Sequence, residues 1–263
     1  MKIKFGVVTF PGSNCDQDMV YILEKVLKQE VVSLWHKERD LKGVDMVVLP
    51  GGFSFGDYLR SGAIAKFSPI MNDVITHSQK GGYVLGICNG FQILTETGLL
   101  DGALLHNNNQ KFICKNVHLK PVSTSAAISK GLDHNMAYSV PIAHGEGRYY
   151  AGEDTISKLQ NNDQILFKYC DKNGVDSDAV NPNGSVLNIA GVTNETKNVF
   201  GMMPHPERSS DPENARAPFH TSIFNALETG RLSTYHRANS GRWSRVFFGV
   251  SKLSAYARAQ KCD

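Results

Sequence analysis

The sequence has no apolar run approaching the ~18 residues that a membrane-spanning helix requires. Its first ten residues, MKIKFGVVTF, contain no apolar region followed by a small-residue cleavage site, so we expect no secretory signal. The cysteines are scattered, without a CxxC pair, which argues against a zinc site or a disulfide framework. We therefore predict a reducing, cytoplasmic location, no membrane association and no metal site. The five cysteines are Cys15, Cys88, Cys114, Cys170 and Cys262.

The net charge is also small, at a formal value of +3 over 263 residues. It is unevenly placed, because residues 231–263 carry seven Lys or Arg side chains against one acid, and the rest of the chain is mildly acidic. A nucleic-acid partner would depend on this short tail alone, and we do not expect one. We describe residues 231–263 as a basic C-terminal extension of unknown role.

What the first half of the chain does contain is an alternation of apolar strands and helices. Apolar residues with strand character come before glycine-rich turns, and helical spacing follows. This order predicts an α/β fold with a central, mostly parallel sheet flanked by helices. The predicted strands are 2–10, 31–35, 45–50 and 83–88, and the predicted helices are 13–27, 61–80 and 89–97. Ser13–Asp16 resembles a capping box for the first helix.

The second half is β-rich, with strand-like segments separated by turn residues such as Asn-Gly. We expect it to complete the same domain, which would end with a helix over 218–227 near residue 230. In sheets of this class, ligands bind beyond the carboxyl ends of the strands. The loop 50–57 and Cys88 should therefore share one edge of the sheet.

The segment GICNGFQIL has the form of a nucleophile elbow, with Cys88 between Gly86 and Gly90. Side chains at the two glycine positions would collide with the neighbouring strand and helix. The turn would place the thiol at a helix N-terminus, which favours thiolate, and leave the N–H of Asn89 free to stabilise an oxyanion. A buried structural cysteine in a glycine-rich turn is the alternative.

A cysteine nucleophile needs a base, and His205 in GMMPHPER is our candidate among nine histidines. Glu207 lies two residues further on, so in an extended segment both side chains point the same way and the carboxylate can orient the imidazole. An exposed His-Pro loop is the alternative. In PGGFSFGD, Gly52 is the candidate for a second oxyanion donor, and a plain turn is the alternative there.

Together these motifs resemble the class I, or triad, glutamine amidotransferases. Within that class the resemblance is closest to the glutaminase subunits of phosphoribosylformylglycinamidine synthase, from about residue 2 to residue 228. The segments that carry it are FPGSNCD, GGFSFGDYLRSGAIA, GICNGFQIL, HGEGRYY, NPNGS and GMMPHPER.

The resemblance implies an amidotransferase domain over residues 1–230 that hydrolyses glutamine to glutamate and ammonia through a thioester on Cys88. It implies substrate contacts at Gln92, His144 and Glu146. It also implies transfer of ammonia to a larger synthase subunit that binds ATP, Mg²⁺ and formylglycinamide ribonucleotide, often with a small accessory subunit. This chain has no Walker-type loop, so we expect no cofactor of its own.

Two other functions remain open from the residues alone. The fold could serve as an inactive scaffold for a partner, although a scaffold need not keep a thiol, a base and a carboxylate. A self-sufficient hydrolase of γ-glutamyl substrates would use the same residues. Such an enzyme should reach full rate alone, whereas a subunit should be slow until its synthase is added.

Overall fold

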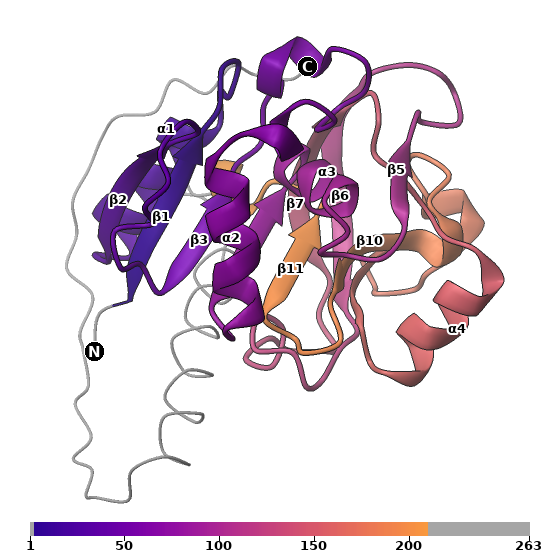
Figure 1. Cartoon of the computed structure of the whole chain (residues 1–263). Coiled ribbons are helices and arrows are strands. Elements are labelled where there is room, and N and C mark those ends of the chain that lie inside the picture. Colours follow the sequence, from indigo (N-terminus) through magenta and orange to yellow (C-terminus); the bar gives the residue numbers. More distant parts are fainter. Residues whose placement is uncertain (1–2, 210–263) are drawn as a thin grey trace, which may run out of the picture.

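A nine-stranded sheet organises the part of the chain that the computed structural model describes, residues 3–209 (Figure 1). Its strand order is β2-β1-β3-β4-β11-β10-β9-β6-β7, and β5 pairs with β8 in a separate small sheet. The large sheet contains β1 (Lys4–Thr9), β2 (Glu30–Trp35), β3 (Met46–Leu49), β4 (Tyr83–Ile87), β6 (Ile113–Pro121), β7 (Tyr138–His144), β9 (Ile165–Cys170), β10 (Ile189–Thr193) and β11 (Val199–Met202); the small sheet contains β5 (Ala103–Leu105) and β8 (Arg148–Tyr150).

The large sheet changes direction at β11. The pairs β1–β2, β1–β3, β3–β4 and β4–β11 are parallel, whereas β11–β10, β10–β9, β9–β6 and β6–β7 are antiparallel. The α/β class with a β-rich second half is confirmed. The strands β2, β1, β3, β4 and β11 form the parallel part, and the other strands of the second half join the same sheet and make it mixed.

The core lies at the centre of this sheet, where strands are covered on both sides. Every residue of β3 and of β11 is buried, which matches their uninterrupted apolar sequences. Four helices flank the sheet, and α2 and α3 pass in front of β3 and β11 in Figure 1. They are α1 (Asp16–Tyr21), α2 (Ile70–Gln79), α3 (Asn89–Glu96) and α4 (Glu153–Asn161).

Two local predictions need correction, and one helix was missed. The helix expected over 61–80 is divided, because Ser68 precedes Pro69 and is extended (ψ 137°), as residues before proline tend to be. A short 3₁₀ turn, Ala65–Phe67, stands before that break and α2 follows it. Ser13 does not cap α1, since its hydroxyl accepts the N–H of Phe10 at 3.1 Å instead. Helix α4, with one fully buried side chain, was not predicted.

Other predicted elements are confirmed within a few residues. The first helix continues through a π-helical stretch, Ile22–Val26, and so ends close to the expected residue 27. Helix α3 is followed by Gly98 with φ 71°, as its predicted stop requires. The predicted closing helix over 218–227 and the basic extension 231–263 lie outside the described residues.

Candidate active site

Cys88 occupies the sharp turn between β4 and α3, and its backbone has φ 50° and ψ −106°. This is a strained conformation for a residue that carries a side chain. The predicted reason for the flanking glycines is confirmed. A Cβ on Gly90 would overlap the carbonyl oxygen of Leu49 in β3, and a Cβ on Gly86 would lie 2.6 Å from the backbone of Gly90. The turn can therefore form only with these small residues.

The thiol of Cys88 is buried, with 5% of the residue exposed. Its backbone N–H donates to Met202 O at the end of β11, at 2.8 Å, and its Sγ lies 3.7 Å from Ala143 O. Asn89 begins α3, so its N–H has no carbonyl partner within the helix. A negatively charged atom next to Cys88 would meet this helix N-terminus.

His205 and Glu207 follow β11 and are almost completely buried, with 2% and 1% exposed. The imidazole Nδ1 and Glu207 Oε1 are 2.6 Å apart. A carboxylate only accepts hydrogen bonds, so Nδ1 carries the hydrogen and Nε2 is the nitrogen left for proton transfer. The N–H of His205 donates to Pro141 O at 2.9 Å, which ties the base to β7. The expected pairing of these two side chains is present in the structure.

The charge on His205 depends on opposing effects. Burial alone lowers the pKa of the imidazole, but the Glu207 carboxylate and then the Cys88 side chain raise it well above its ordinary value. The geometry agrees with this influence of Cys88, because the Cys88 N–H donates to the carbonyl of Met202, three residues before His205. A raised pKa favours an imidazolium that can donate a proton to a leaving group.

A second thiol, that of Cys15, lies beside the catalytic base His205, and sequence reasoning did not assign it a role. Cys15 is 1% exposed, and Arg208 Nη2 lies 3.0 Å from its Sγ. Burial raises the pKa of Cys15, although His205 and Arg208 oppose this, so the sulfur remains a neutral thiol. Its position within SNCDQD, directly before α1, was the available signal; the residue before a parallel-sheet helix lies at the same edge as the elbow.

Cys15, His205 and Glu207 place possible metal-binding atoms within 4.8 Å of one another. Two features oppose a cation there. The imidazole N–H already occupies Glu207 Oε1, and the positively charged Arg208 lies against the Cys15 sulfur. The donor set therefore suits proton transfer better than metal binding.

The loop after β3 lies against His205 and Cys15. A Cβ on Gly51 would lie 2.6 Å from His205 Cε1 and 3.1 Å from Cys15 Sγ, so the loop backbone packs directly on the base. Gly52 has φ 138°, and a Cβ there would lie 2.7 Å from the Asn14 nitrogen. The loop thus approaches the triad in a conformation that favours glycine. Gly52 as an oxyanion donor stays a prediction.

The side chain of Gln92 and the backbone of Glu146 are hydrogen-bonded to each other. Gln92 Nε2 donates to Glu146 O at 2.6 Å, and Gln92 Oε1 accepts from Asn89 Nδ2 at 3.0 Å. The Glu146 carboxylate accepts the N–H of Ser61 at 3.2 Å and lies 3.4 Å from His106 Nε2. Both residues adjoin the elbow, and their predicted contacts with substrate stay predictions.

His144 is buried and its tautomer follows from its neighbour Asn107. Asn107 Nδ2 donates to the carbonyls of Lys111 and His144, so Asn107 Oδ1 must be the acceptor for His144 Nδ1 at 3.0 Å. His144 Nε2 therefore carries a lone pair, and it has no hydrogen-bond partner within residues 3–209. Burial, and after it the charge of His205, lower the pKa of His144 to about 4, so the ring is neutral at pH 7.

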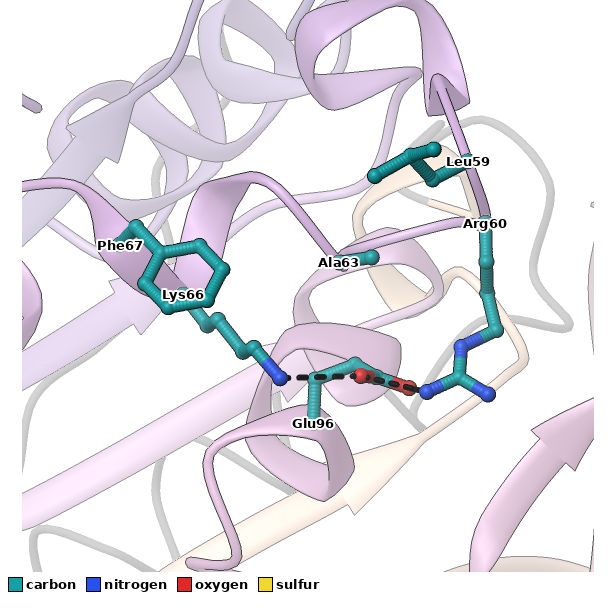
Figure 2. Close-up of a pocket in the computed structure, with 6 residues that line it drawn as sticks. All are labelled: Leu59, Arg60, Ala63, Lys66, Phe67 and Glu96. Atoms are coloured by element: carbon teal, nitrogen blue, oxygen red, sulfur yellow. Dashed lines mark hydrogen bonds and ion pairs between the residues drawn. The ribbon is translucent and has the colours of Figure 1, made fainter.

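Beyond the elbow, the surface carries a pocket of about 350 Å³ with charged and apolar walls. Figure 2 shows Glu96 between Arg60 and Lys66, at 2.6 Å and 3.6 Å respectively. Two apolar residues of the pocket, Leu59 and Phe67, are 85% and 78% exposed. The edge of this pocket therefore exposes more apolar surface than is usual for a protein without a partner.

A buried thiol in an elbow, an imidazole oriented by a carboxylate and a helix N-terminus together form the apparatus of covalent amide hydrolysis. An α/β fold with this arrangement at its strand ends is that of a cysteine-dependent amide hydrolase. No helix within residues 3–209 has the length and apolar character to cross a membrane. The sequence matches the CobB/CobQ-like glutamine amidotransferase domain over residues 2–246, and the chain belongs to that family.

Similar proteins narrow the assignment. The chain is 55% identical over 207 residues to the phosphoribosylformylglycinamidine synthase subunit PurQ of Synechocystis, covering 79% of this chain and 92% of that one. It is 50% identical over 229 residues to the PurQ of Gloeobacter violaceus, covering 86% of this chain and 99% of that one. Among solved structures, PurLQS from Thermotoga maritima has a TM-score of 0.76 at 36% identity, covering 88% of this chain and 100% of that one. The predicted resemblance to these glutaminase subunits is confirmed.

Proposed function

We propose that this chain is the glutaminase subunit of a phosphoribosylformylglycinamidine synthase. It hydrolyses glutamine and supplies ammonia to a synthase subunit, which uses ATP to convert formylglycinamide ribonucleotide to the amidine. The observation that carries the proposal is the buried Cys88–His205–Glu207 arrangement in a chain of this family, with His205 and Glu207 2.6 Å apart. The setting we propose is the cytoplasm.

In the first half of the reaction, His205 takes the proton of the Cys88 thiol and becomes an imidazolium, and the sulfur attacks the side-chain amide carbon of glutamine. Negative charge develops on the carbonyl oxygen, and the N–H groups of Asn89 and Gly52 stabilise it. The imidazolium of His205 then gives its Nε2 proton to the leaving nitrogen, so the C–N bond breaks, ammonia departs and a thioester remains on Cys88. Glu207 stabilises the charged imidazole throughout.

In the second half, neutral His205 takes a proton from water, and the resulting hydroxide attacks the thioester carbon. The same N–H groups stabilise the second oxyanion. The C–S bond breaks, glutamate leaves and the Cys88 thiolate pairs again with the His205 imidazolium. Gln92, Glu146 and His144 lie around the elbow, and we assign them to holding the amino-acid part of glutamine. No cofactor enters these steps.

For the partner, we propose a larger synthase subunit, with a small accessory subunit, docked over the edge of the sheet that carries Cys88. The supporting observation is the group of exposed apolar side chains beside the elbow. Phe53, Tyr58, Leu59 and Phe67 are 45%, 73%, 85% and 78% exposed. We retain residues 1–230 as the amidotransferase domain and 231–263 as an extension.

The test is a glutamine hydrolysis assay with and without the purified synthase subunit, ATP and formylglycinamide ribonucleotide. We expect a slow rate alone, a large increase in the complete mixture and glutamine-dependent formation of the amidine. Cys88→Ala should abolish hydrolysis yet still bind the synthase. Wild-type hydrolysis by Cys88→Ala would refute the mechanism, and full activity without the synthase would favour the independent hydrolase.

A further inference from the structure

The side chain of Asn89, the residue directly after the nucleophile, is held by bonds from two elements. Its Oδ1 accepts the N–H of Ser54 at 3.1 Å, and its Nδ2 donates to Gln92 Oε1 at 3.0 Å and to Asp57 Oδ1 at 3.2 Å. Asn89, Ser54 and Gln92 are buried, at 2%, 2% and 5% exposed. Asp57 is half-buried and supplies the charged acceptor of this network.

Asp57 belongs to a loop with an unusual backbone. Phe55, Gly56, Asp57 and Leu59 all have positive φ, between 52° and 71°. Residues with side chains persist in this conformation only where the surroundings hold them. The bonds to Asn89 hold one end of the loop, and the N–H of Ser61 donates to Glu146 Oε2 at the other end. The loop is thus built to place the Asp57 carboxylate against Asn89.

The position of Asn89 matters because an oxyanion donor must lie about 2.7–3.1 Å from the developing charge to be effective. The side-chain amide of Asn89 is joined to the backbone at the start of α3 by only two rotatable bonds. Fastening the amide at Oδ1 and Nδ2 therefore restrains the backbone that carries the N–H. Groups that hold a catalytic donor in this way affect rate more than binding.

We propose that Asp57 is a positioning residue, whose carboxylate holds Asn89 so that the Asn89 N–H faces the oxyanion. This inference rests on the proposed glutaminase function and assigns a role in it to the loop 53–61. Asp57 itself does not touch the reacting atoms.

The electrostatics of the site support this role and give it a signature. The pKa of Asp57 is raised to about 6, chiefly by burial and also by the Glu146 carboxylate, although the hydrogen bonds from Ser61 and Asn89 act to lower it. Glu146 is in turn paired with His106. Above pH 6 the ionised carboxylate is a strong acceptor for Asn89 Nδ2; below pH 6 protonation weakens that bond. The rate should therefore fall as the pH drops through about 6.

The experiment compares wild type, Asp57→Ala and Asp57→Asn in the complex with the synthase subunit. We expect Asp57→Ala to lower kcat for glutamine hydrolysis roughly 10- to 100-fold, less than loss of a donor, while KM changes little. Asp57→Asn keeps an acceptor oxygen without the titration, so it should restore most of kcat at pH 8 and lose the fall in rate near pH 6. Asp154→Ala, an exposed aspartate in α4, is the matched control and should behave as wild type.

A second measurement separates positioning from damage to the nucleophile. Alkylation of Cys88 by iodoacetamide needs no oxyanion donor, so its rate should be the same in Asp57→Ala and wild type. Parallel loss of alkylation and hydrolysis, or wild-type kcat and pH profile in Asp57→Ala, would overturn the inference. Absence of glutamine hydrolysis in the wild-type complex would instead refute the proposed function.

Discussion

The two strand ends that meet at the site hold their side chains in different ways. Cys88 is fixed by its backbone, since its positive φ and the overlaps that exclude side chains at Gly86 and Gly90 leave a single arrangement. His205 is fixed by side-chain bonding, through the 2.6 Å contact between its Nδ1 and Glu207. The nucleophile therefore depends on shape and the base on charge, and substitutions should separate these two dependences.

The largest effect is expected at the elbow. Gly90→Ala would force a Cβ into the carbonyl oxygen of Leu49, so β3 and α3 would have to move apart. Overpacking of this kind costs about 1–3 kcal/mol or more, and here backbone atoms give no room to adjust. We expect a large fall in the urea midpoint together with loss of glutamine hydrolysis.

The control for that change is Gly152→Ala, because a Cβ there meets nothing within 4 Å and φ is −70°. Gly152 is the N-cap of α4, where alanine is less favourable, so a small loss is expected, but the urea midpoint should fall much less than in Gly90→Ala. A Gly90→Ala protein with unchanged stability and rate would show that the elbow does not need its glycines.

At the base, we expect a large loss of activity without loss of fold. Glu207→Gln keeps the shape but removes the charge that raises the pKa of His205, and the amide can present a donor to Nδ1. General acid–base catalysis contributes roughly 10²–10⁴-fold, and the rate of hydrolysis should fall within that range. Imidazole titration followed by NMR should show a lower pKa for His205.

Glu195→Gln, at an exposed carboxylate, serves as the control for Glu207→Gln. If Glu207→Gln retained the wild-type rate, the contrast between a shape-dependent nucleophile and a charge-dependent base would fail.

The smallest effect at neutral pH concerns stability, because it develops only in acid. The pKa of His144 is lowered to about 4 in the fold, whereas the ordinary value is 6.5. Between pH 6.5 and 4, His144 is protonated in the unfolded chain but stays neutral in the folded chain. Its contribution therefore makes the free energy of unfolding fall as the pH drops through this range. The contribution is up to about 3 kcal/mol. His144→Asn, whose amide can still donate to Asn107, should flatten this part of the curve of unfolding free energy against pH.

An unchanged slope in His144→Asn would mean that His144 is neither buried nor neutral as described. Thermal or urea unfolding at intervals of half a pH unit measures the slope directly. Asp57 titrates in the same range with the opposite sign, because its pKa is raised in the fold. Comparison of the two single variants keeps these contributions apart.

The sequence predicted what depends on local chain chemistry and left out what depends on distant contacts. Cys88 with its glycines, and His205 two residues from Glu207, were visible because short spacings determine their geometry. Cys15 was not assigned, because its approach to Arg208, 193 residues away, depends on the fold. Asp57 was passed over for the same reason, since its bond to Asn89 crosses from the loop after β3 to the start of α3.

The sheet could be predicted only in its first half. Parallel strands buried on both sides produce continuous apolar segments, and the alternation with helices reveals their order. The direction of the later strands depends on which neighbours they pair with, and no local signal shows that β11 lies between β4 and β10. Pro69 is a local signal for the break before α2, but the apolar residues on both sides of it keep helical spacing and favour one continuous helix.

The hydrogen bonds that tie Cys88 to Met202 and His205 to Pro141 have a consequence for control of the enzyme. The first bond joins the ends of β4 and β11, the strands that lead to the nucleophile and to the base, so the separation of these two segments is set by the sheet, whose strands lie about 4.8 Å apart. The second bond ties the base to β7. A regulator cannot alter that separation without breaking the central sheet. Any change of rate on assembly must therefore act through loops and side-chain rotations at the edge of the sheet, and the inhibitors and activators of this site should leave the strands where they are.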